Sequence, residues 1–125
     1  MPKEIKRNSI VFVKNHSPFY AKTYIMRGDH YAVVCQNDLG NAYSSSIIIC
    51  YITSKVKRLD IRANVPIKHY AGLDYKPAMI KCSQIMTVDH DDIIAVVDML
   101  RDEDEIRFNQ GIIASLALPN TLFLE

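Results

Sequence analysis

Two short apolar runs, residues 31–35 and 47–52, are the most pronounced hydrophobic feature of the chain. Both are continuous, rich in β-branched residues and bounded by turn-forming residues, which is the pattern of strands that are buried on both faces. The polar stretch 36–46 between them predicts a loop. Four of its residues tolerate the turns that such a loop needs, and we assign them a shaping role: Asn37, Asp38, Gly40 and Asn41.

Polar residues stand at the outer ends of the two predicted strands. His30 precedes the first run and Thr53 follows the second. If the strands pair as antiparallel neighbours, these two residues fall near the same end of the sheet. This end is the best candidate for a functional site, and a basic cluster follows it directly: Lys55, Lys57 and Arg58.

Further strands are predicted on both sides of this central pair. Residues 9–14 have the β-branched and aromatic character of a first strand. Residues 59–67 alternate apolar and polar side chains, and Pro66 near the end of this segment favours an edge position in the sheet. Residues 78–81 and 84–88 predict either two short strands or one strand that is interrupted by a bulge.

The last third of the chain has the pattern of two helices. An apolar face over residues 93–100, preceded by Asp89 and His90 as N-cap candidates, predicts the first helix. The second helix is expected to begin at Asp102, where Glu105 completes a capping-box pattern. Five of its residues are expected to be buried: Ile106, Phe108, Ile112, Ile113 and Leu116. Strands followed by helices predict an α+β fold built on a small curled sheet.

Length and composition narrow the class of protein. The 125 residues suffice for one domain, over 1–125, whose core needs no disulfide or metal ion. No apolar run approaches the ~20 residues of a membrane span, and the charged N-terminal segment lacks the pattern of a signal peptide. Cys35, Cys50 and Cys82 are therefore expected to be free thiols in a reducing compartment. We expect a cytoplasmic protein that uses no cofactor.

Charge is distributed unevenly along the chain. Residues 1–81 carry 13 Lys/Arg and 5 Asp/Glu, a net charge of +8, whereas residues 82–125 carry 2 and 9, a net charge of −7. A basic body of this kind favours an anionic partner. We interpret the acids of the C-terminal segment as solvated positions near helix N-termini, where they suit the helix dipole.

Three segments resemble the MazF/PemK family of toxins. Residues 32–53 resemble an apolar strand, an Asn-Asp-x-Gly-Asn loop with following serines, and a second strand that closes on a threonine. Residues 84–89 (Gln-Ile-Met-Thr-Val-Asp) are similar to the family's Gln-Ile-Arg-Thr-Ile-Asp segment, and residues 113–118 are similar to its last helix. The resemblance covers nearly the whole chain, in order and with compatible spacing.

This resemblance implies a fold, a set of partners and an activity together. The implied fold is an SH3-like barrel, a small curled antiparallel sheet with C-terminal helices, assembled as a homodimer. The implied activity is that of a type II toxin–antitoxin toxin, a metal-independent, sequence-specific endoribonuclease that cleaves single-stranded mRNA and is neutralised by a cognate antitoxin. In such cleavage the ribose 2′-hydroxyl attacks its own phosphorus, so the protein must move protons and stabilise the charge that builds on the phosphorane.

The resemblance also indicates which residues carry the reaction. Family members use an arginine before the first central strand and a threonine after the second; Thr53 matches the threonine, whereas His30 stands at the arginine position. His30 is a candidate general acid or base, because histidine side chains titrate near neutral pH. Arg27 is a candidate for the missing guanidinium, because it lies three residues before His30. The third interpretation is a site that has lost or changed its chemistry.

Contacts to RNA are predicted around this site. Basic side chains bind phosphates and aromatic rings stack on unpaired bases, which favours four residues: Lys55, Lys57, Arg58 and Tyr24. Gln84, at the start of the family-like segment 84–89, is predicted as a fifth RNA contact. Two alternatives to a nuclease stay open. One is a non-nucleolytic toxin of the gyrase-poison type, which shares this barrel and needs no acid–base pair; the other is a catalytically impaired family member that acts by binding only.

Overall fold

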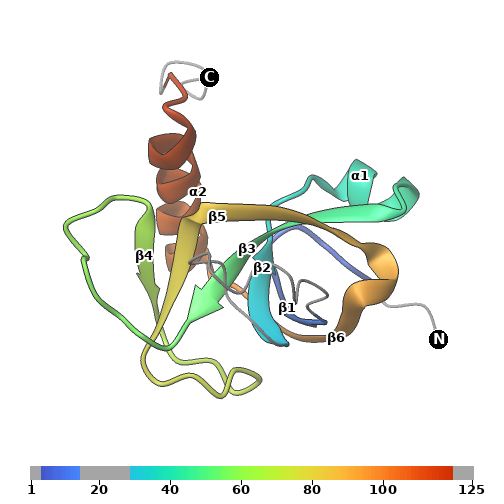
Figure 1. Ribbon diagram of the computed structural model, residues 1–125, viewed down its shortest axis with the longest axis horizontal. Coiled ribbons are helices and arrows are strands. Elements are labelled where there is room, and N and C mark those ends of the chain that lie inside the picture. Colours follow the sequence, from blue (N-terminus) through green and yellow to red (C-terminus); the bar gives the residue numbers. More distant parts are fainter. Residues whose placement is uncertain (1–3, 15–28, 120–125) are drawn as a thin grey trace, which may run out of the picture.

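The computed structural model describes residues 4–14 and 29–119, which form a six-stranded antiparallel sheet and one C-terminal helix (Figure 1). The strand order is β4-β5-β3-β2-β1-β6, and every neighbouring pair is antiparallel. The strands are β1 (Ser9–Val13), β2 (His30–Val34), β3 (Ser46–Thr53), β4 (Asn64–Ile67), β5 (Ala78–Asp89) and β6 (Ile93–Met99). The helices are α1 (Asp38–Tyr43), the 3₁₀ helix η2 (His90–Asp92) and α2 (Asp102–Leu116). The predicted α+β class with an antiparallel sheet is confirmed, but the sheet is not closed.

The central strands β2 and β3 are buried on both faces of the sheet, as their continuous apolar runs predicted. One face contributes to a core under α2, with members that include Val33, Cys50, Ile52 and Phe108. The other face contributes to a second core, with members that include Ala32, Val34, Ile49 and Tyr51. Side chains alternate between the two cores because successive residues of a strand point to opposite faces.

The segment predicted as the first C-terminal helix is strand β6. Val11 of β1 lies opposite Val96 of β6, so β6 supplies the hydrogen-bonding partner that the outer side of β1 needs. A short apolar run fits a helix and a strand equally well, and pairing with a neighbour decides between them. The predicted N-cap is confirmed in part. Asp89 is the N-cap of the short helix η2, and its carboxylate accepts a hydrogen bond from the Asp91 amide at 3.0 Å.

The predicted 36–46 loop contains the short helix α1. Its N-cap is Asn37, whose side chain accepts a hydrogen bond from the Gly40 amide at 2.7 Å. Asn41 donates to the Gln36 carbonyl at 3.0 Å, and the Asp38 carboxylate accepts from the Arg7 amide at 2.6 Å. The shaping role assigned to these residues is therefore confirmed, although they shape a helical turn.

The two remaining strand predictions were partly right. Only Asn64–Ile67 of the expected 59–67 strand pairs with the sheet, and β4 lies at an edge, as Pro66 indicated. Segment 78–89 is one strand with a bulge, since the pairing with β3 shifts register between Cys50 and Ile52.

Helix α2 begins at Asp102 as predicted, but its packing differs from the expectation. Arg101 is the N-cap without a side-chain cap bond, so the predicted capping box is wrong; Glu105 instead accepts a hydrogen bond from Asn8 at 2.7 Å. The buried stripe consists of three residues at helical spacing: Asp104, Phe108 and Gly111. Of the five residues expected to be buried, Phe108 is buried, Ile112 and Ile113 are half-buried, and Ile106 and Leu116 are exposed. No helix in the described part of the chain is long and apolar enough to cross a membrane.

Gly111 allows α2 to approach the sheet closely. A Cβ atom at this position would lie 2.5 Å from Val65 Cγ2 and 2.8 Å from Cys82 Sγ. Glycine in a helix interior costs about 1 kcal/mol relative to alanine, so the close approach explains its presence there.

The buried carboxylate of Asp104 ties α2 to the segment that follows β4. It accepts hydrogen bonds from the Tyr70 hydroxyl at 2.6 Å and the Lys68 amide at 3.0 Å, and it pairs with Arg107. Burial alone would raise the pKa of Asp104, but these donors outweigh it and hold the pKa below its usual value. The Tyr70 hydroxyl in turn accepts from the Arg101 amide at 2.9 Å, at the start of the helix.

Segment 68–77 carries this connection across to the opposite edge of the sheet. The Gly72 amide donates to the Asp98 carboxylate of β6 at 3.2 Å, and a Cβ atom on Gly72 would collide with the Val97 carbonyl. Leu73 is buried beside it. The segment therefore bridges the two outer strands, β4 and β6, of a sheet whose own hydrogen bonds do not close.

We expect Asp104→Ala to lower the free energy of unfolding by about 3 kcal/mol, because it leaves buried donors without their acceptor. Urea denaturation at neutral pH measures this loss. Because the folded pKa is depressed, the stabilisation is present above about pH 4, the range of an unfolded carboxyl group, and disappears as the pH falls through the folded pKa. Asp102→Ala, at an exposed position in the same first turn of α2, is the matched control; an equal effect of both variants would contradict the role of the buried carboxylate.

We expect Gly111→Ala to destabilise the protein by about 1–2 kcal/mol, because the cost of overpacking exceeds the helix-propensity gain of about 1 kcal/mol. Thermal unfolding compared with the wild type measures it. A more stable variant would show that Val65 and Cys82 yield without cost.

Candidate functional site

The register of β2 and β3 brings the two predicted catalytic positions together. Ala32 lies opposite Tyr51 and Val33 lies opposite Cys50. Continued by two residues, this register places His30, the first residue of β2, opposite Thr53, the last residue of β3. The prediction that both residues lie at the same end of the sheet is confirmed.

The half-buried imidazole of His30 has two tyrosine neighbours from different elements. The Tyr51 ring of β3 meets it edge-on, with ring centroids 6.2 Å apart and an interplanar angle of 72°. The Tyr75 hydroxyl, from the segment before β5, lies 3.3 Å from His30 Nδ1. Burial, and then the Asp92 carboxylate, raises the pKa of Tyr51, so this tyrosine is protonated at neutral pH.

Aromatic contacts hold Tyr75 in place beside His30. The rings of Tyr31 and Tyr75 are nearly perpendicular, with centroids 5.1 Å apart, and the Phe12 ring also contacts Tyr31, with centroids 4.9 Å apart. The Tyr31 hydroxyl donates a hydrogen bond to the Asp74 carboxylate at 3.0 Å. Burial and the nearby Asp74 raise the pKa of both tyrosines, which keeps their hydroxyl groups protonated.

Thr53 ends β3 with an ordered hydroxyl group. The side chain is buried, and its oxygen accepts a hydrogen bond from the Lys55 amide at 3.1 Å. This bond fixes the hydroxyl oxygen and leaves its proton for donation to a ligand. Lys55 and Lys57 follow with exposed side chains, as expected for residues that contact phosphates.

The other predicted RNA contacts are placed less favourably. Arg58 forms two 3.1 Å hydrogen bonds with the Asp60 carboxylate, so its guanidinium is engaged within its own turn. Gln84 lies half-buried in the bulged part of β5. Tyr24, and with it the proposed catalytic Arg27, lies outside the described residues.

Four of the described arginines have contacts elsewhere in the fold: Arg7 at the Cys35 carbonyl, Arg58 at Asp60, Arg101 at Tyr70 and Arg107 at Asp104. The fifth, Arg62, lines the groove described below. Among the described residues at this end of the sheet, His30 is the candidate for proton transfer. Within the same residues, no group of three or more potential ligands could hold a metal ion.

Sequence patterns did not reveal Tyr75 as a neighbour of His30. The two residues are 45 positions apart, and Tyr75 lies in a segment without periodicity. The three cysteines agree better with expectation: all are free, with Cys50 and Cys82 buried and Cys35 half-buried.

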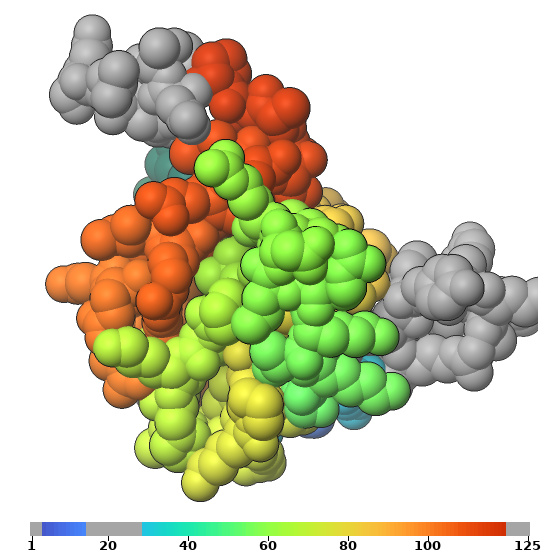
Figure 2. Space-filling model, turned by 90° about the vertical axis from the view of Figure 1, so that its left-hand side faces the viewer, coloured from blue at the N-terminus to red at the C-terminus, as the bar shows by residue number. Residues whose placement is uncertain are grey.

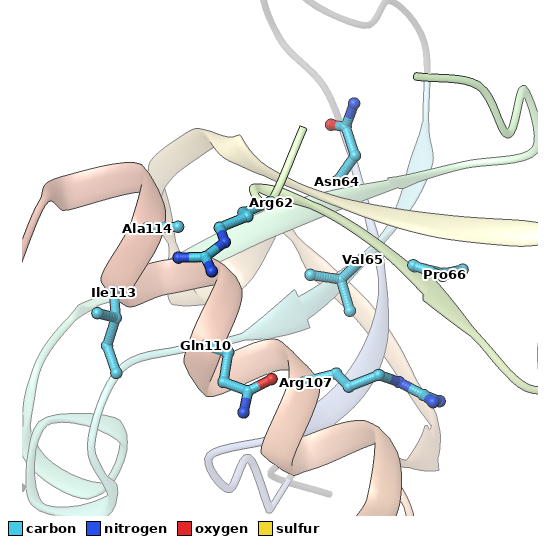
Figure 3. Close-up of a pocket in the computed structure, with 8 residues that line it drawn as sticks. All are labelled: Arg62, Asn64, Val65, Pro66, Arg107, Gln110, Ile113 and Ala114. Atoms are coloured by element: carbon cyan, nitrogen blue, oxygen red, sulfur yellow. The ribbon is translucent and has the colours of Figure 1, made fainter. Parts of the chain in front are cut away.

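A groove of about 380 Å³ between β4 and α2 was also not predicted (Figure 3). Figure 2 shows this face, with α2 in orange to red beside the green segments that lead into β4. The lining residues are Arg62, Asn64, Val65, Pro66, Arg107, Gln110, Ile113 and Ala114. The Arg62 side chain extends from the segment before β4 toward α2, and Gln110 projects from α2 nearby. The lining residues of the groove include no group that exchanges protons near neutral pH, so His30 and Thr53 stay the candidates for catalysis.

Comparisons with known proteins agree with this architecture. A family model described as "PemK-like, MazF-like toxin of type II toxin-antitoxin system" matches residues 6–116. The endoribonuclease MazF of Staphylococcus saprophyticus is 31% identical over 86 residues, which span 69% of this chain and 72% of that protein. A mycobacterial endoribonuclease in complex with its cognate antitoxin has a TM-score of 0.74 at 13% identity, covering 92% of this chain and 97% of its own. MazF of Deinococcus radiodurans has a TM-score of 0.70 at 12% identity, covering 91% and 97%. These two structures share the fold.

Proposed function

The chain belongs to the family of PemK-like, MazF-like toxins of type II toxin–antitoxin systems, and on this premise we propose that it is a metal-independent endoribonuclease acting on single-stranded mRNA in the cytoplasm. The observation that carries the proposal is the juxtaposition of His30 and Thr53 at one end of the central strand pair. A proton-transferring group and an ordered hydroxyl then lie beside exposed lysines, which is the set of groups that RNA transesterification needs.

The proposed reaction is an attack of the ribose 2′-hydroxyl on the adjacent phosphorus. A bond from the 2′-oxygen to phosphorus forms, the bond to the 5′-oxygen breaks, and the products are a 2′,3′-cyclic phosphate and a 5′-hydroxyl. His30 takes the proton of the 2′-hydroxyl, and the leaving 5′-oxygen receives a proton from water. The Thr53 hydroxyl donates a hydrogen bond to a non-bridging phosphate oxygen, and Arg27 is the candidate for stabilising the charge on the phosphorane.

The lysines that follow Thr53 have a supporting role. Lys55 and Lys57 contribute positive charge along the RNA backbone, which raises affinity without reading sequence. Arg58 and Gln84 remain proposals of the same kind, although the ion pair of Arg58 with Asp60 must open before its guanidinium can bind phosphate.

We expect His30→Ala to lower the rate of cleavage by about 10²-fold or more, as for the loss of a general acid or base. The measurement is incubation with a long single-stranded RNA in EDTA, followed by mapping of the ends. His30→Arg restores the family pattern and should preserve or raise activity. His69→Ala, at an exposed histidine of segment 68–77, is the control and should cleave like the wild type.

Two outcomes would contradict this assignment. If His30→Ala cleaves like the wild type, His30 takes no part in the reaction. If only His30→Arg cleaves, the natural protein acts by binding. The second candidate is a toxin that acts by binding only, either of the gyrase-poison type or as an impaired nuclease. The presence of His30 where the family has an arginine favours this candidate. The cleavage assay decides between an active nuclease and a protein that only binds.

A cognate antitoxin is the second partner that we propose, and the groove between β4 and α2 is its proposed contact. Arg62 and Arg107 line the groove together with apolar residues such as Val65, a combination that complements an acidic and apolar segment, although the Arg107 guanidinium is also paired with Asp104. The net charge of +8 over residues 1–81 supports the same class of partner. Pro66 has no N–H group, so the free edge of β4 is a poor site for an added strand. We therefore expect the antitoxin segment to be bound by side chains of the groove, without backbone pairing to β4.

We also propose a homodimer. The exposed apolar side chains of α2 support self-association, since Ile106 and Leu116 are more than half exposed. Leu118, just beyond the helix, extends this apolar surface.

We expect Arg62→Glu to weaken antitoxin binding by about tenfold or more, because it places a like charge against an acidic segment. Titration calorimetry with the product of the adjacent small reading frame, at low and moderate salt, measures the change. Lys6→Glu makes the same change of charge on an exposed side chain away from the groove and serves as the control. Equal affinities for both variants would exclude the groove as the contact.

A further inference from the structure

We propose that Tyr75 is a positioning residue that fixes the orientation and the tautomer of the His30 imidazole. In this arrangement His30 Nδ1–H donates to the Tyr75 hydroxyl oxygen, and Nε2 is the atom that exchanges protons with RNA. The consequence for catalysis rests on the proposed nuclease function, whereas the effect on the imidazole itself does not.

Two contacts fix the plane of the His30 ring. Tyr75 Oη lies 3.3 Å from Nδ1, and the edge-on contact with Tyr51 restricts rotation about the side-chain bonds. Tyr75 belongs to segment 68–77 and Tyr51 belongs to β3. A shift of one of these elements therefore leaves the contact of His30 with the other tyrosine in place. A histidine held in this way has a defined ring plane.

Tyr75 is suited to this role because its own position is determined by the fold. Its ring packs nearly perpendicular to Tyr31, whose hydroxyl bonds to the neighbouring Asp74. Three residues earlier, Gly72 is pressed against the Val97 carbonyl and donates to Asp98. The segment that presents the Tyr75 hydroxyl is thus anchored to both β2 and β6.

In this proposal Nδ1 carries the proton, because Nε2 must offer a lone pair to take the proton of the ribose hydroxyl. A neutral imidazole has one N–H group and one lone pair, and the hydrogen bond made by one nitrogen determines the role of the other. With Nδ1–H bound to Tyr75, the lone pair of Nε2 takes the proton of the ribose hydroxyl. The imidazolium that results keeps the same bond to Tyr75, so no rearrangement interrupts the cycle. The Tyr75 oxygen can accept this bond while protonated, and burial, which raises its pKa, keeps it so.

Tyr75→Phe in the full-length chain separates positioning from packing, because it removes the hydroxyl and keeps the ring against Tyr31. The first measurement is the tautomer of His30 at pH 8, where histidine side chains are mostly neutral, by long-range ¹H–¹⁵N correlation on ¹⁵N-histidine-labelled protein. His30→Gln identifies the signal. We expect the Nδ1–H form to dominate in the wild type and to lose its majority in Tyr75→Phe. Tyr43→Phe, at an exposed tyrosine of α1, should leave the tautomer unchanged.

The second measurement is RNA cleavage by the same variants. We expect Tyr75→Phe to lower kcat by about tenfold with KM nearly unchanged, as for loss of a partner that orients a functional histidine. The loss should vanish in the His30→Ala background, because Tyr75 acts through His30.

The outcomes distinguish this inference from the proposed function. An unchanged tautomer in Tyr75→Phe, or an equal loss of rate with and without His30, would overturn the positioning role. A shifted tautomer in a protein that never cleaves RNA would support the positioning of His30 and overturn the nuclease function instead.

Discussion

The buried carboxylate of Asp104 is the interaction on which the arrangement of this fold depends. It joins α2 to the backbone of Lys68 and the side chain of Tyr70, directly after edge strand β4. Segment 68–77, fixed at this end, reaches β6 at Gly72 and then returns toward β2. An open six-stranded sheet has two free edges, and this segment spans the distance between them. The energetic reason is that a buried charge is tolerated only where several donors meet it, so the donors and the helix must occupy fixed positions.

The candidate site is a consequence of the same arrangement. Pairing of β2 with β3 brings His30 and Thr53 to one end of the sheet. Tyr75 is added from segment 68–77, whose course is set by contacts with α2 and β6. Segment 68–77 therefore serves both stability and the candidate site. It bridges the outer strands of the sheet, and it places the Tyr75 hydroxyl beside the His30 imidazole. A change at Asp104 or Gly72 can reach His30 through this path, without contact to RNA.

The replacement of an arginine by His30 changes what the site can do. A guanidinium is permanently charged and offers several donors to a phosphate, whereas an imidazole both takes and gives a proton near neutral pH. Thr53 matches the threonine that the family resemblance leads us to expect, and β2 and β3 place it beside His30. Four of the described arginines have contacts elsewhere, among them the pair of Arg107 with Asp104. In the proposed reaction, proton transfer by His30 therefore takes the place of electrostatic stabilisation by an arginine at this position.

The sequence by itself determined the parts of this protein that depend on local pattern. Residues 31–35 and 47–52 are β-branched apolar runs bounded by turn-forming residues, which predicted buried strands. Antiparallel pairing of these strands then places His30 and Thr53 at one end. Residues 93–99 form a short apolar run that fits either a helix or a strand. They form strand β6 because their backbone pairs with the outer side of β1. The contact of His30 with Tyr75 and the groove between Arg62 and Arg107 join positions 45 residues apart. Such contacts arise when separate elements pack, and no periodicity along the chain encodes them.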